Sequence, residues 1–375
     1  MIIDRIFSHI EPLLKPNKVV VIYGPRRVGK TTLLNEFLKT TKLKYRLETG
    51  ENIRVQEVLG SRDFQKIGDY IGNNELIAID EAQYIKGIGL GLKIIVDNFP
   101  GIKVIATGSS SFDLAGQIGE PLVGRKFTIT LYPFAQLELA QIHNIFDLKQ
   151  KLEEFLLFGT YPDVYLAKTK DEKMAALNEI ADSYLLKDVL AYDGVKKPKI
   201  LVDLVKMLAL QVGNEVSLTE LSQKLGVNLN TVVKYLDILE KGFVIVPCGS
   251  LKRNLRNEIR GKKKYYFYDN GVRNALLSQF NELSLRNDVG ALWENFIFTE
   301  RLKTRAYKNI GANYYFWRTY QQKEIDLVEE YGGVLHGYEF KWNGSAGKPK
   351  EFSGAYPQST FEVINKENYL DFLTD

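Results

Sequence analysis

The feature that most constrains this chain is an eight-residue loop between a predicted strand and a predicted helix. Residues 24–31 read Gly-Pro-Arg-Arg-Val-Gly-Lys-Thr, which fits the pattern G-x-x-x-x-G-K-S/T. A run of β-branched residues, Val19 to Ile22, precedes the loop, and an amphipathic stretch from Thr32 to Lys39 follows it. This order predicts a phosphate-binding loop in an α/β fold with a parallel sheet. The alternative is an ordinary glycine-rich turn before a helix.

Each residue type in the loop suits the binding of a nucleotide. The glycines let backbone N–H groups wrap the β- and γ-phosphates, and the N-terminus of the following helix adds a favourable dipole. Lys30 is expected to place its charge between the two phosphates, and the Thr31 hydroxyl is expected to be a ligand of Mg²⁺. We expect the nucleotide to contact the whole segment: Gly24, Pro25, Arg26, Arg27, Val28, Gly29, Lys30, Thr31 and Thr32.

Two further predicted strands end in polar residues. Leu76 to Ile79 is followed by Asp80 and Glu81, and Lys103 to Ala106 is followed by Thr107-Gly-Ser-Ser-Ser111. The carboxyl edge of a parallel sheet is where open α/β sheets bind ligands. Asp80 is therefore predicted to lie on the metal side, and Glu81 to polarise the attacking water. The alternatives are a helix N-terminus with favourable acids and a serine-rich helix cap.

Taken together, these motifs resemble the bacterial and archaeal branch of the AAA-type ATPases, within the AAA+ superfamily. The resemblance rests on Gly24 to Thr31, Ile79-Asp-Glu-Ala-Gln83, Thr107 to Ser111 and Leu122-Val-Gly-Arg125, and it extends over nearly the whole chain. It implies ATP as the nucleotide, hydrolysis of that ATP, and Ser109 or Ser110 as the sensor. It also implies that Arg125 senses or stabilises the γ-phosphate charge, in its own subunit or in a neighbouring copy. A surface arginine before a strand is the alternative for Arg125.

The periodicity of the chain predicts three domains, and the resemblance implies what each one is. Residues 1–192 are expected to form the ATPase core with a helical lid, and residues 193–275 a winged helix-turn-helix. Residues 276–375 are expected to form an α/β domain like that of restriction endonucleases. The predicted fold class is therefore α/β, with a P-loop NTPase sheet followed by two smaller folds.

Charge and cysteine content exclude several classes of protein. Lys and Arg number 50 against 46 for Asp and Glu, so the net charge is only +4, and any contact with DNA requires a local patch. Cys248 is the one cysteine among the 375 residues, which excludes an internal disulfide, and the wide spacing of the three histidines argues against a Cys/His zinc site. No apolar run approaches the ~18 residues of a membrane helix, so a cytoplasmic protein is expected.

The predicted middle domain contains a helix-turn-helix pattern. Ser217 to Leu225 and Leu229 to Lys241 read as two helices joined at Gly226. The second helix is expected to present Asn230, Thr231 and Lys234 to a DNA major groove. A wing would carry seven basic residues against one acid between residues 252 and 264: Lys252, Arg253, Arg256, Arg260, Lys262, Lys263 and Lys264. The alternative is a module that docks a protein.

The last predicted domain holds a group of carboxylates around a Gly-Gly turn. Pairing two strands about Gly332-Gly333 gives opposed residues whose numbers sum to 665, so Asp326 faces Glu339 and Glu324 faces Lys341. The pattern resembles that of PD-(D/E)XK nucleases, with Glu294 from a preceding helix as a third acid. It predicts a site for Mg²⁺ or Mn²⁺, because two facing carboxylates repel unless a cation lies between them. The alternative is a hairpin with a charged, solvated face.

Overall fold

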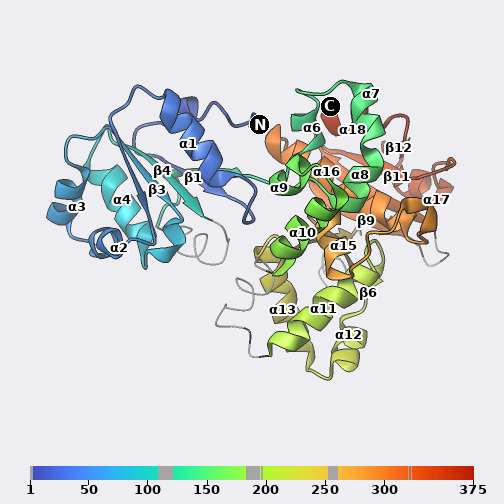
Figure 1. Ribbon diagram of the computed structural model, residues 1–375. Helices are drawn as coiled ribbons and strands as arrows, with labels where there is room; N and C mark the ends of the chain where they lie inside the picture. Colours follow the sequence, from blue (N-terminus) through green and yellow to red (C-terminus); the bar gives the residue numbers. More distant parts are fainter. Residues whose placement is uncertain are drawn as a thin grey trace. The chain divides into compact units, whose positions relative to one another are not determined.

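A computed structural model describes residues 3–108, 121–182, 195, 197–251, 261–319, 321 and 323–375. These residues form two compact units (Figure 1). Unit 1 comprises Met1–Tyr132 with Lys241–Phe243, and unit 2 comprises Pro133–Glu240 with Val244–Asp375. No helix in the described ranges is long and apolar enough to cross a membrane.

Unit 1 contains a parallel sheet whose described strands have the order β2-β3-β4-β1-β5. All four strand pairs are parallel, as the buried β-branched runs predicted. The central strands lie where the sequence placed them, whereas the two edge strands were not predicted. The elements are β1 (Val19–Tyr23), α1 (Lys30–Thr40), β2 (Tyr45–Thr49), α2 (Ile53–Gly60), α3 (Phe64–Ile71), β3 (Leu76–Asp80), α4 (Ile88–Asn98), β4 (Lys103–Gly108) and β5 (Lys126–Thr130).

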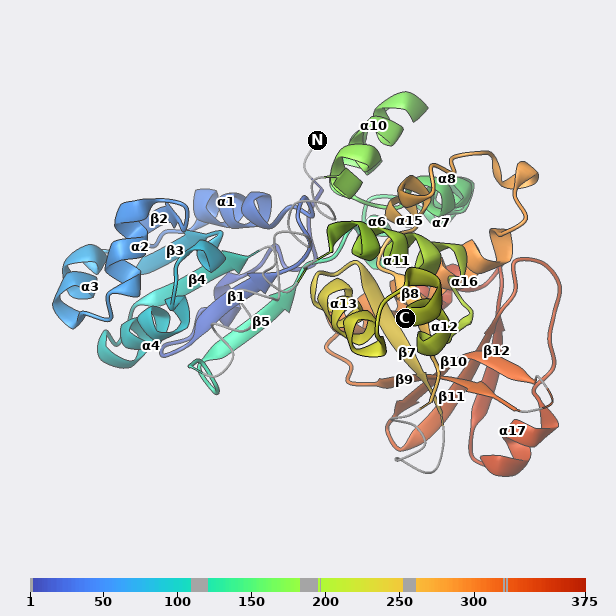
Figure 2. The same cartoon turned by 90° about the horizontal axis from the view of Figure 1, so that it is seen from below.

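Helices cover both faces of this sheet (Figure 2). Alternate residues of β1, β3 and β4 pack with α2, α3 and α4 into one core, which includes Val21, Ile79 and Ala106. On the opposite side α1 buries Leu33, Leu34, Phe37 and Leu38. Because the three central strands are covered on both faces, their backbone is fixed, and the loops at their carboxyl ends start from rigid points.

Unit 2 is built from helices and a mixed sheet of strand order β12-β11-β10-β9-β7-β8-β6 among the described strands. Its first elements are α6 (Gln136–Leu139), α7 (Ile145–Gln150), α8 (Leu152–Phe158), α9 (Pro162–Leu166), α10 (Lys170–Ile180), α11 (Pro198–Leu210), β6 (Glu215–Val216), α12 (Leu218–Leu225), α13 (Leu229–Lys241), β7 (Ile245–Ser250) and β8 (Lys263–Phe267). The remainder are α15 (Asn270–Leu276), α16 (Val289–Tyr307), β9 (Asn313–Arg318), β10 (Glu324–Tyr331), β11 (Val334–Phe340), α17 (Lys350–Ala355), β12 (Thr360–Ile364) and α18 (Tyr369–Thr374).

The two strands predicted to form a wing, β7 and β8, share one sheet with the C-terminal strands. β7 pairs antiparallel with β8 and parallel with β9, through Gly249 opposite Tyr315 and Ser250 opposite Phe316. The packing therefore differs from the predicted division at residue 275, since the strands on the two sides of that position are continuous in the sheet. The helices α6 to α10, which the sequence assigned to the ATPase domain as its lid, also lie in unit 2. The predicted boundary at residue 192 falls outside the described residues.

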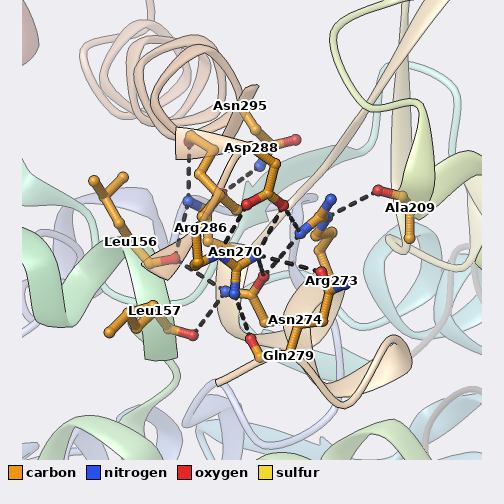
Figure 3. Close-up of polar contacts among 11 residues, drawn as sticks. Leu156, Leu157, Ala209, Asn270, Arg273, Asn274, Gln279, Arg286, Asp288 and Asn295 are labelled. Atoms are coloured by element: carbon orange, nitrogen blue, oxygen red, sulfur yellow. Dashed lines mark hydrogen bonds and ion pairs between the residues drawn. The ribbon is translucent and has the colours of Figure 1, made fainter. Parts of the chain in front are cut away.

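The short helix α15 joins the helical part of unit 2 to its sheet (Figure 3). Asn274 Nδ2 donates to the carbonyls of Leu156 and Leu157 at 3.1 and 2.9 Å, at the end of α8. Arg273 Nε donates to the carbonyl of Ala209 at 2.8 Å, at the end of α11. The last carbonyls of a helix have no partner within it, so side chains of α15 satisfy the ends of two other helices.

The charge of Arg273 is balanced inside the same group of side chains. Its guanidinium contacts Asp288 Oδ2 at 2.7 Å, and Arg286 contacts both oxygens of Asp288 at 2.8 and 2.7 Å (Figure 3). On the other side of α15, Asn295 Nδ2 donates to Asn270 Oδ1 at 2.7 Å, which fixes α16 against α15. We call this group, with Asn274, the α15 hub.

Removing Asn274 is expected to destabilise unit 2. Its side chain is fully buried, and Asn274→Ala leaves two buried carbonyl groups without this donor. We expect a loss of about 2–4 kcal/mol in the free energy of unfolding, measured by urea denaturation. The control Asn230→Ala removes an exposed asparagine of the same unit and should change it by about 0.5 kcal/mol or less. Equal losses in the two variants would contradict the role assigned to the hub.

Candidate functional sites

The loop after β1 adopts a backbone that requires its glycines. Gly24 has φ 151°, and a Cβ there would lie 2.0 Å from the carbonyl oxygen of Leu131. Arg27 and Gly29 also have positive φ, 61° and 92°. Left-handed residues within a loop turn neighbouring backbone N–H groups toward one concave side, where an anion binds. The helix α1 begins immediately afterwards, at Lys30.

Lys30 is buried within this loop. Its Nζ donates to the carbonyl oxygens of Gly24 and Pro25 at 3.0 and 2.7 Å. Only 5% of the residue is exposed, so the ammonium is held at the inner side of the loop and not in solvent. From this position the Lys30 ammonium can give up its hydrogen bonds to the loop carbonyls and bind phosphate oxygens instead.

Asp80 connects the loop to two strands of the sheet. Its Oδ2 accepts a hydrogen bond from Thr31 Oγ1 at 2.9 Å, and its Oδ1 accepts one from the hydroxyl of Thr107, the fifth residue of β4. The strands β1 and β3 are not neighbours, because β4 lies between them. The structure thus brings Thr31 and Asp80 together as predicted. A hydroxyl beside a carboxylate is an oxygen donor set that suits Mg²⁺, so these residues fit the predicted ion.

Glu81 follows in an unusual backbone conformation. It has φ 51°, a left-handed value that non-glycine residues rarely adopt. Its N–H donates to Thr107 Oγ1 at 3.0 Å, and its carboxylate accepts a hydrogen bond from Gln83 Nε2. A Cβ at Gly50 would lie 2.3 Å from the Glu81 carbonyl oxygen, so β2 also supports this turn. The side chain of Glu81 is therefore oriented by its own short segment.

The structure does not bring Arg125 to the loop of its own chain. The N–H of Val19, at the start of β1, donates to the carbonyl of Arg125 at 2.8 Å. The phosphate-binding loop follows the other end of this five-residue strand, about 16 Å away at ~3.3 Å per residue. The Arg125 side chain instead pairs with Asp97 at 2.6 Å. The structure therefore leaves Arg125 away from the loop of its own chain, and its role at a nucleotide, in its own or in a neighbouring copy, stays a prediction. Ser109 and Ser110 lie outside the described residues.

The helix-turn-helix has the predicted local structure. Ser217 caps α12 by accepting from the N–H of Glu220 at 3.3 Å, and Gly226 ends that helix with φ 62°. Asn230 and Lys234 are exposed on α13, whereas the Thr231 hydroxyl donates to Asn228 at 2.8 Å and belongs to the helix cap. Val233 of the same helix is 48% exposed.

The three lysines predicted to contact DNA through the wing divide into two classes. Lys262 and Lys263 are exposed, and Lys262 lies 3.2 Å from Glu215. Lys264 is 1% exposed, so the prediction that it contacts DNA is wrong. Lys264 is followed by buried residues of β8, whereas Lys263 is the first residue of that strand and Lys262 precedes it. The basic residues 252 to 260 lie outside the described part of the chain.

The C-terminal hairpin has the predicted register. Leu327 pairs with Tyr338 and Tyr331 with Val334, which are pairs that sum to 665. Next to Leu327, the side chain of Asp326 bonds to the backbone of the other strand. Its Oδ2 accepts a hydrogen bond from the N–H of Phe340 at 2.7 Å. The expected pair of Glu324 and Lys341 is not formed, because Lys341 Nζ donates to Glu339 at 2.6 Å.

Lys264 lies among the predicted metal ligands. Its Nζ is 2.9 Å from Glu294 Oε1, 2.6 Å from Glu324 Oε1 and 3.9 Å from Asp326 Oδ1. We call Glu294, Glu324, Asp326 and Glu339 the acidic cluster. Burial lowers the pKa of Lys264, but the carboxylates of the cluster outweigh it, so the pKa of this lysine lies above its ordinary value. The ammonium is therefore charged.

Within the described residues, no group of three or more His, Cys, Asp and Glu side chains is arranged to hold a metal ion. The acidic cluster is no exception, because a lysine separates its members. Burial raises the pKa of Asp326 well above its ordinary value, and the neighbouring Glu294 and Glu339 raise it further, against the lowering effect of Lys264. The predicted carboxylates are thus brought together, but around an ammonium.

Sequence reasoning missed Thr107, Gln83 and Lys264 as members of these sites. Thr107 and Gln83 belong to motifs on which the resemblance rests. Both motifs follow predicted strands, so the sequence could have placed these two residues at the carboxyl edge of the sheet. Lys264 carried a misleading signal, since it ends a run of three lysines. Only the strand pairing of β8 shows that it points inward.

The raised pKa of Asp326 predicts that the stability of the protein depends on pH. An acid whose pKa is higher in the folded than in the unfolded protein binds its proton more tightly when folded, so stability falls as pH rises from about 4 through the raised value. Asp326→Asn cannot titrate and should lack this loss. The melting temperature of the variant should therefore exceed that of wild type by a margin that grows with pH. Asp371→Asn, at an exposed carboxylate, is the control, and a margin for Asp326→Asn that is constant across pH would contradict the prediction.

Three segments of the chain match known family models. Residues 16–140 match a model described as an AAA domain. Residues 149–283 and 289–367 match two models described as domains of unknown function, DUF8612 and DUF4143.

Similar proteins occur in bacteria and archaea. An uncharacterized protein of Mycobacterium tuberculosis is 29% identical over 329 residues, which cover 86% of this chain and 70% of that protein. One of Haemophilus influenzae is 28% identical, with 83% of this chain and 79% of that protein covered. One of Methanocaldococcus jannaschii is 25% identical, with 95% and 82% covered.

Solved structures resemble the chain more distantly. A RuvB mutant of Thermotoga maritima has a TM-score of 0.32 at 16% identity, and covers 66% of this chain and 85% of its own. A signal transduction ATPase with numerous domains from Pyrococcus horikoshii has a TM-score of 0.29 at 14% identity, and covers 83% and 48%. The family match agrees with the loop, the acid pair and the parallel sheet described above, so residues 16–140 match an AAA domain and have a P-loop NTPase fold.

Proposed function

We propose that this chain binds ATP with Mg²⁺ and hydrolyses it. The observation that carries the proposal is Asp80, whose two oxygens accept from Thr31 of the loop and Thr107 of β4, directly before Glu81. Three segments far apart in the sequence thus converge at the carboxyl edge of one parallel sheet. A plain glycine-rich turn requires none of these contacts.

Each residue has a separate part in the proposed reaction. The loop N–H groups and Lys30 hold the β- and γ-phosphates and stabilise charge as the bond to the γ-phosphate breaks. Thr31 and Asp80 hold Mg²⁺, which neutralises phosphate charge when it is bound. Glu81 accepts a proton from the attacking water, and Gln83 sets the direction of its carboxylate.

Substitution of Glu81 should separate binding from turnover. Glu81→Gln keeps the shape of the side chain and the loop, so ATP binding should stay near that of wild type. Loss of the base should lower the hydrolysis rate by about 10²–10⁴-fold. The measurements are binding of a fluorescent ATP analogue and release of phosphate.

Lys30→Ala is the contrasting variant, because it removes the charge that faces the phosphates and should lose binding as well. Hydrolysis by Glu81→Gln at the wild-type rate would remove Glu81 from the mechanism.

We further propose that unit 2 contacts DNA, through α13 and the outer face of the wing. Asn230 and Lys234 on α13 are exposed, as are Lys262, directly before β8, and Lys263, its first residue. All four lie in unit 2 and carry groups that bind bases or phosphates. The alternative is an ATP-controlled switch that docks a protein. A hollow of about 610 Å³ next to α13 favours that alternative, because apolar Leu229 and Val233 line it.

Salt dependence distinguishes the two alternatives. If Lys262 and Lys263 neutralise phosphates, replacing both by Gln should reduce the slope of log affinity against log salt by about 2 for duplex DNA. Fluorescence anisotropy with a labelled duplex at several salt concentrations measures this slope. The control is Lys224→Gln with Lys206→Gln, two lysines of the same unit on other helices. Binding to duplex DNA that does not change with salt, or no binding to duplex DNA, would favour the docking alternative.

Nuclease activity stays a prediction from the resemblance. A metal-dependent nuclease needs carboxylates open to a cation, and Lys264 contacts Glu294 and Glu324 in the acidic cluster. This supports unit 2 as a binding platform more than as a nuclease. The position of Arg125 supports a homo-oligomer, since its proposed role requires the nucleotide of a second copy.

A further inference from the structure

We propose that Lys264 is the resident cation of the acidic cluster and takes the place of a divalent metal. The predicted site and the observed one share their carboxylates but differ in what lies between them. This inference does not depend on ATP hydrolysis, because it concerns residues of unit 2 alone.

The contacts of Glu294 leave little room for a metal. Its Oε1 accepts from Lys264 Nζ at 2.9 Å and from the Tyr266 hydroxyl at 2.7 Å. Behind the carboxylate lies Gly213, where a Cβ would be 2.9 Å from Glu294 Oε2. A metal bound to Glu294 Oε1 would have to displace two donors that come from the buried strand β8.

The other carboxylates are also balanced within the chain. Glu324 contacts Lys264 at 2.6 Å and Arg318 at 3.6 Å, and Glu339 contacts Lys341 at 2.6 Å. Asp326 accepts the N–H of Phe340. Three basic side chains, Lys264, Arg318 and Lys341, therefore face four carboxyl groups. The buried Asp326 needs a positively charged partner least, because protonation can neutralise it.

The placement of Lys264 makes it hard to displace. It is 1% exposed, and its Nζ lies over the Phe316 ring, 5.4 Å from the ring centroid. The lysine lies on β8, which pairs with β7 on one side and with β6 on the other. Moving the ammonium out of the cluster would require either an unpaired buried charge or a change in the sheet, and both are costly.

Removing Lys264 should therefore create a divalent-cation site. Lys264→Met leaves Glu294, Glu324 and Asp326 without their shared cation, and these oxygens are the ligands that Mn²⁺ prefers. In nucleotide-free protein carrying Asp80→Asn, which removes the metal-side acid of the loop, Mn²⁺ is titrated and the free ion is followed by electron paramagnetic resonance. We expect Lys264→Met to bind one Mn²⁺ at least about tenfold more tightly than wild type. Its melting temperature, lowered without metal, should rise with Mn²⁺.

Three further variants control the experiment. Lys264→Arg keeps the charge and should bind no added Mn²⁺. Lys173→Met removes another buried lysine of unit 2, which pairs with one carboxylate, Glu154, and should lower stability without gaining a metal site. Lys264→Gln with Glu324→Gln removes one charge of each sign, and serves as the test if Lys264→Met does not fold.

The wild-type protein can overturn the proposal by itself. Stoichiometric Mn²⁺ binding to wild type that Asp326→Asn abolishes would show that Lys264 does not exclude the metal. Folded Lys264→Met or the double variant without a gain in Mn²⁺ binding would also contradict it. Wild type without Mn²⁺ binding, together with a gain in either variant, would support it.

Discussion

The side-chain hydrogen bonds of α15 hold unit 2 together. Asn274 and Arg273 satisfy carbonyl groups at the ends of α8 and α11, and Asn295 of α16 bonds to Asn270. These groups are buried, so each would lose free energy if its partner moved away. The helices α8, α11, α15 and α16 are consequently held together. If one of these helices moves, the others have to move with it, or the hydrogen bonds of the α15 hub have to break.

Local sequence patterns predicted the local structure around Gly24 to Thr31 well. The loop from Gly24 to Thr31, and Asp80 and Glu81 at a strand end, each depend on a short stretch of chain whose geometry follows from its own residues. The contact of Thr31 with Asp80 also followed, because parallel strands meet at one edge. Thr107 was harder to assign. Its role depends on β4 lying between β1 and β3, and strand order is a property of the whole sheet.

The C-terminal site shows the same limit more strongly. The register of the hairpin was correct because a two-residue turn determines the pairing of the strands it joins. The cation between the carboxylates was not predicted, because it comes from β8, some sixty residues earlier in the sequence and assigned to another domain. Lys262 and Lys264 have the same residue type and lie two positions apart, yet one is exposed and the other buried. Burial of that kind depends on which strand pairs with β8, which no local pattern contains.

The two acidic sites of this chain differ in what their carboxylates contact. At Asp80 the partners are the hydroxyls of Thr31 and Thr107, neutral groups that can rotate and share a carboxylate with an incoming cation. At Glu294 and Glu324 the partner is the ammonium of Lys264, a fixed charge on a buried strand. A divalent ion would gain attraction at the first site without displacing a cation, whereas at the second it would have to expel one into an apolar interior. Carboxylates alone therefore do not define a metal site, and the charge of their nearest donor decides whether a divalent ion would fit between them.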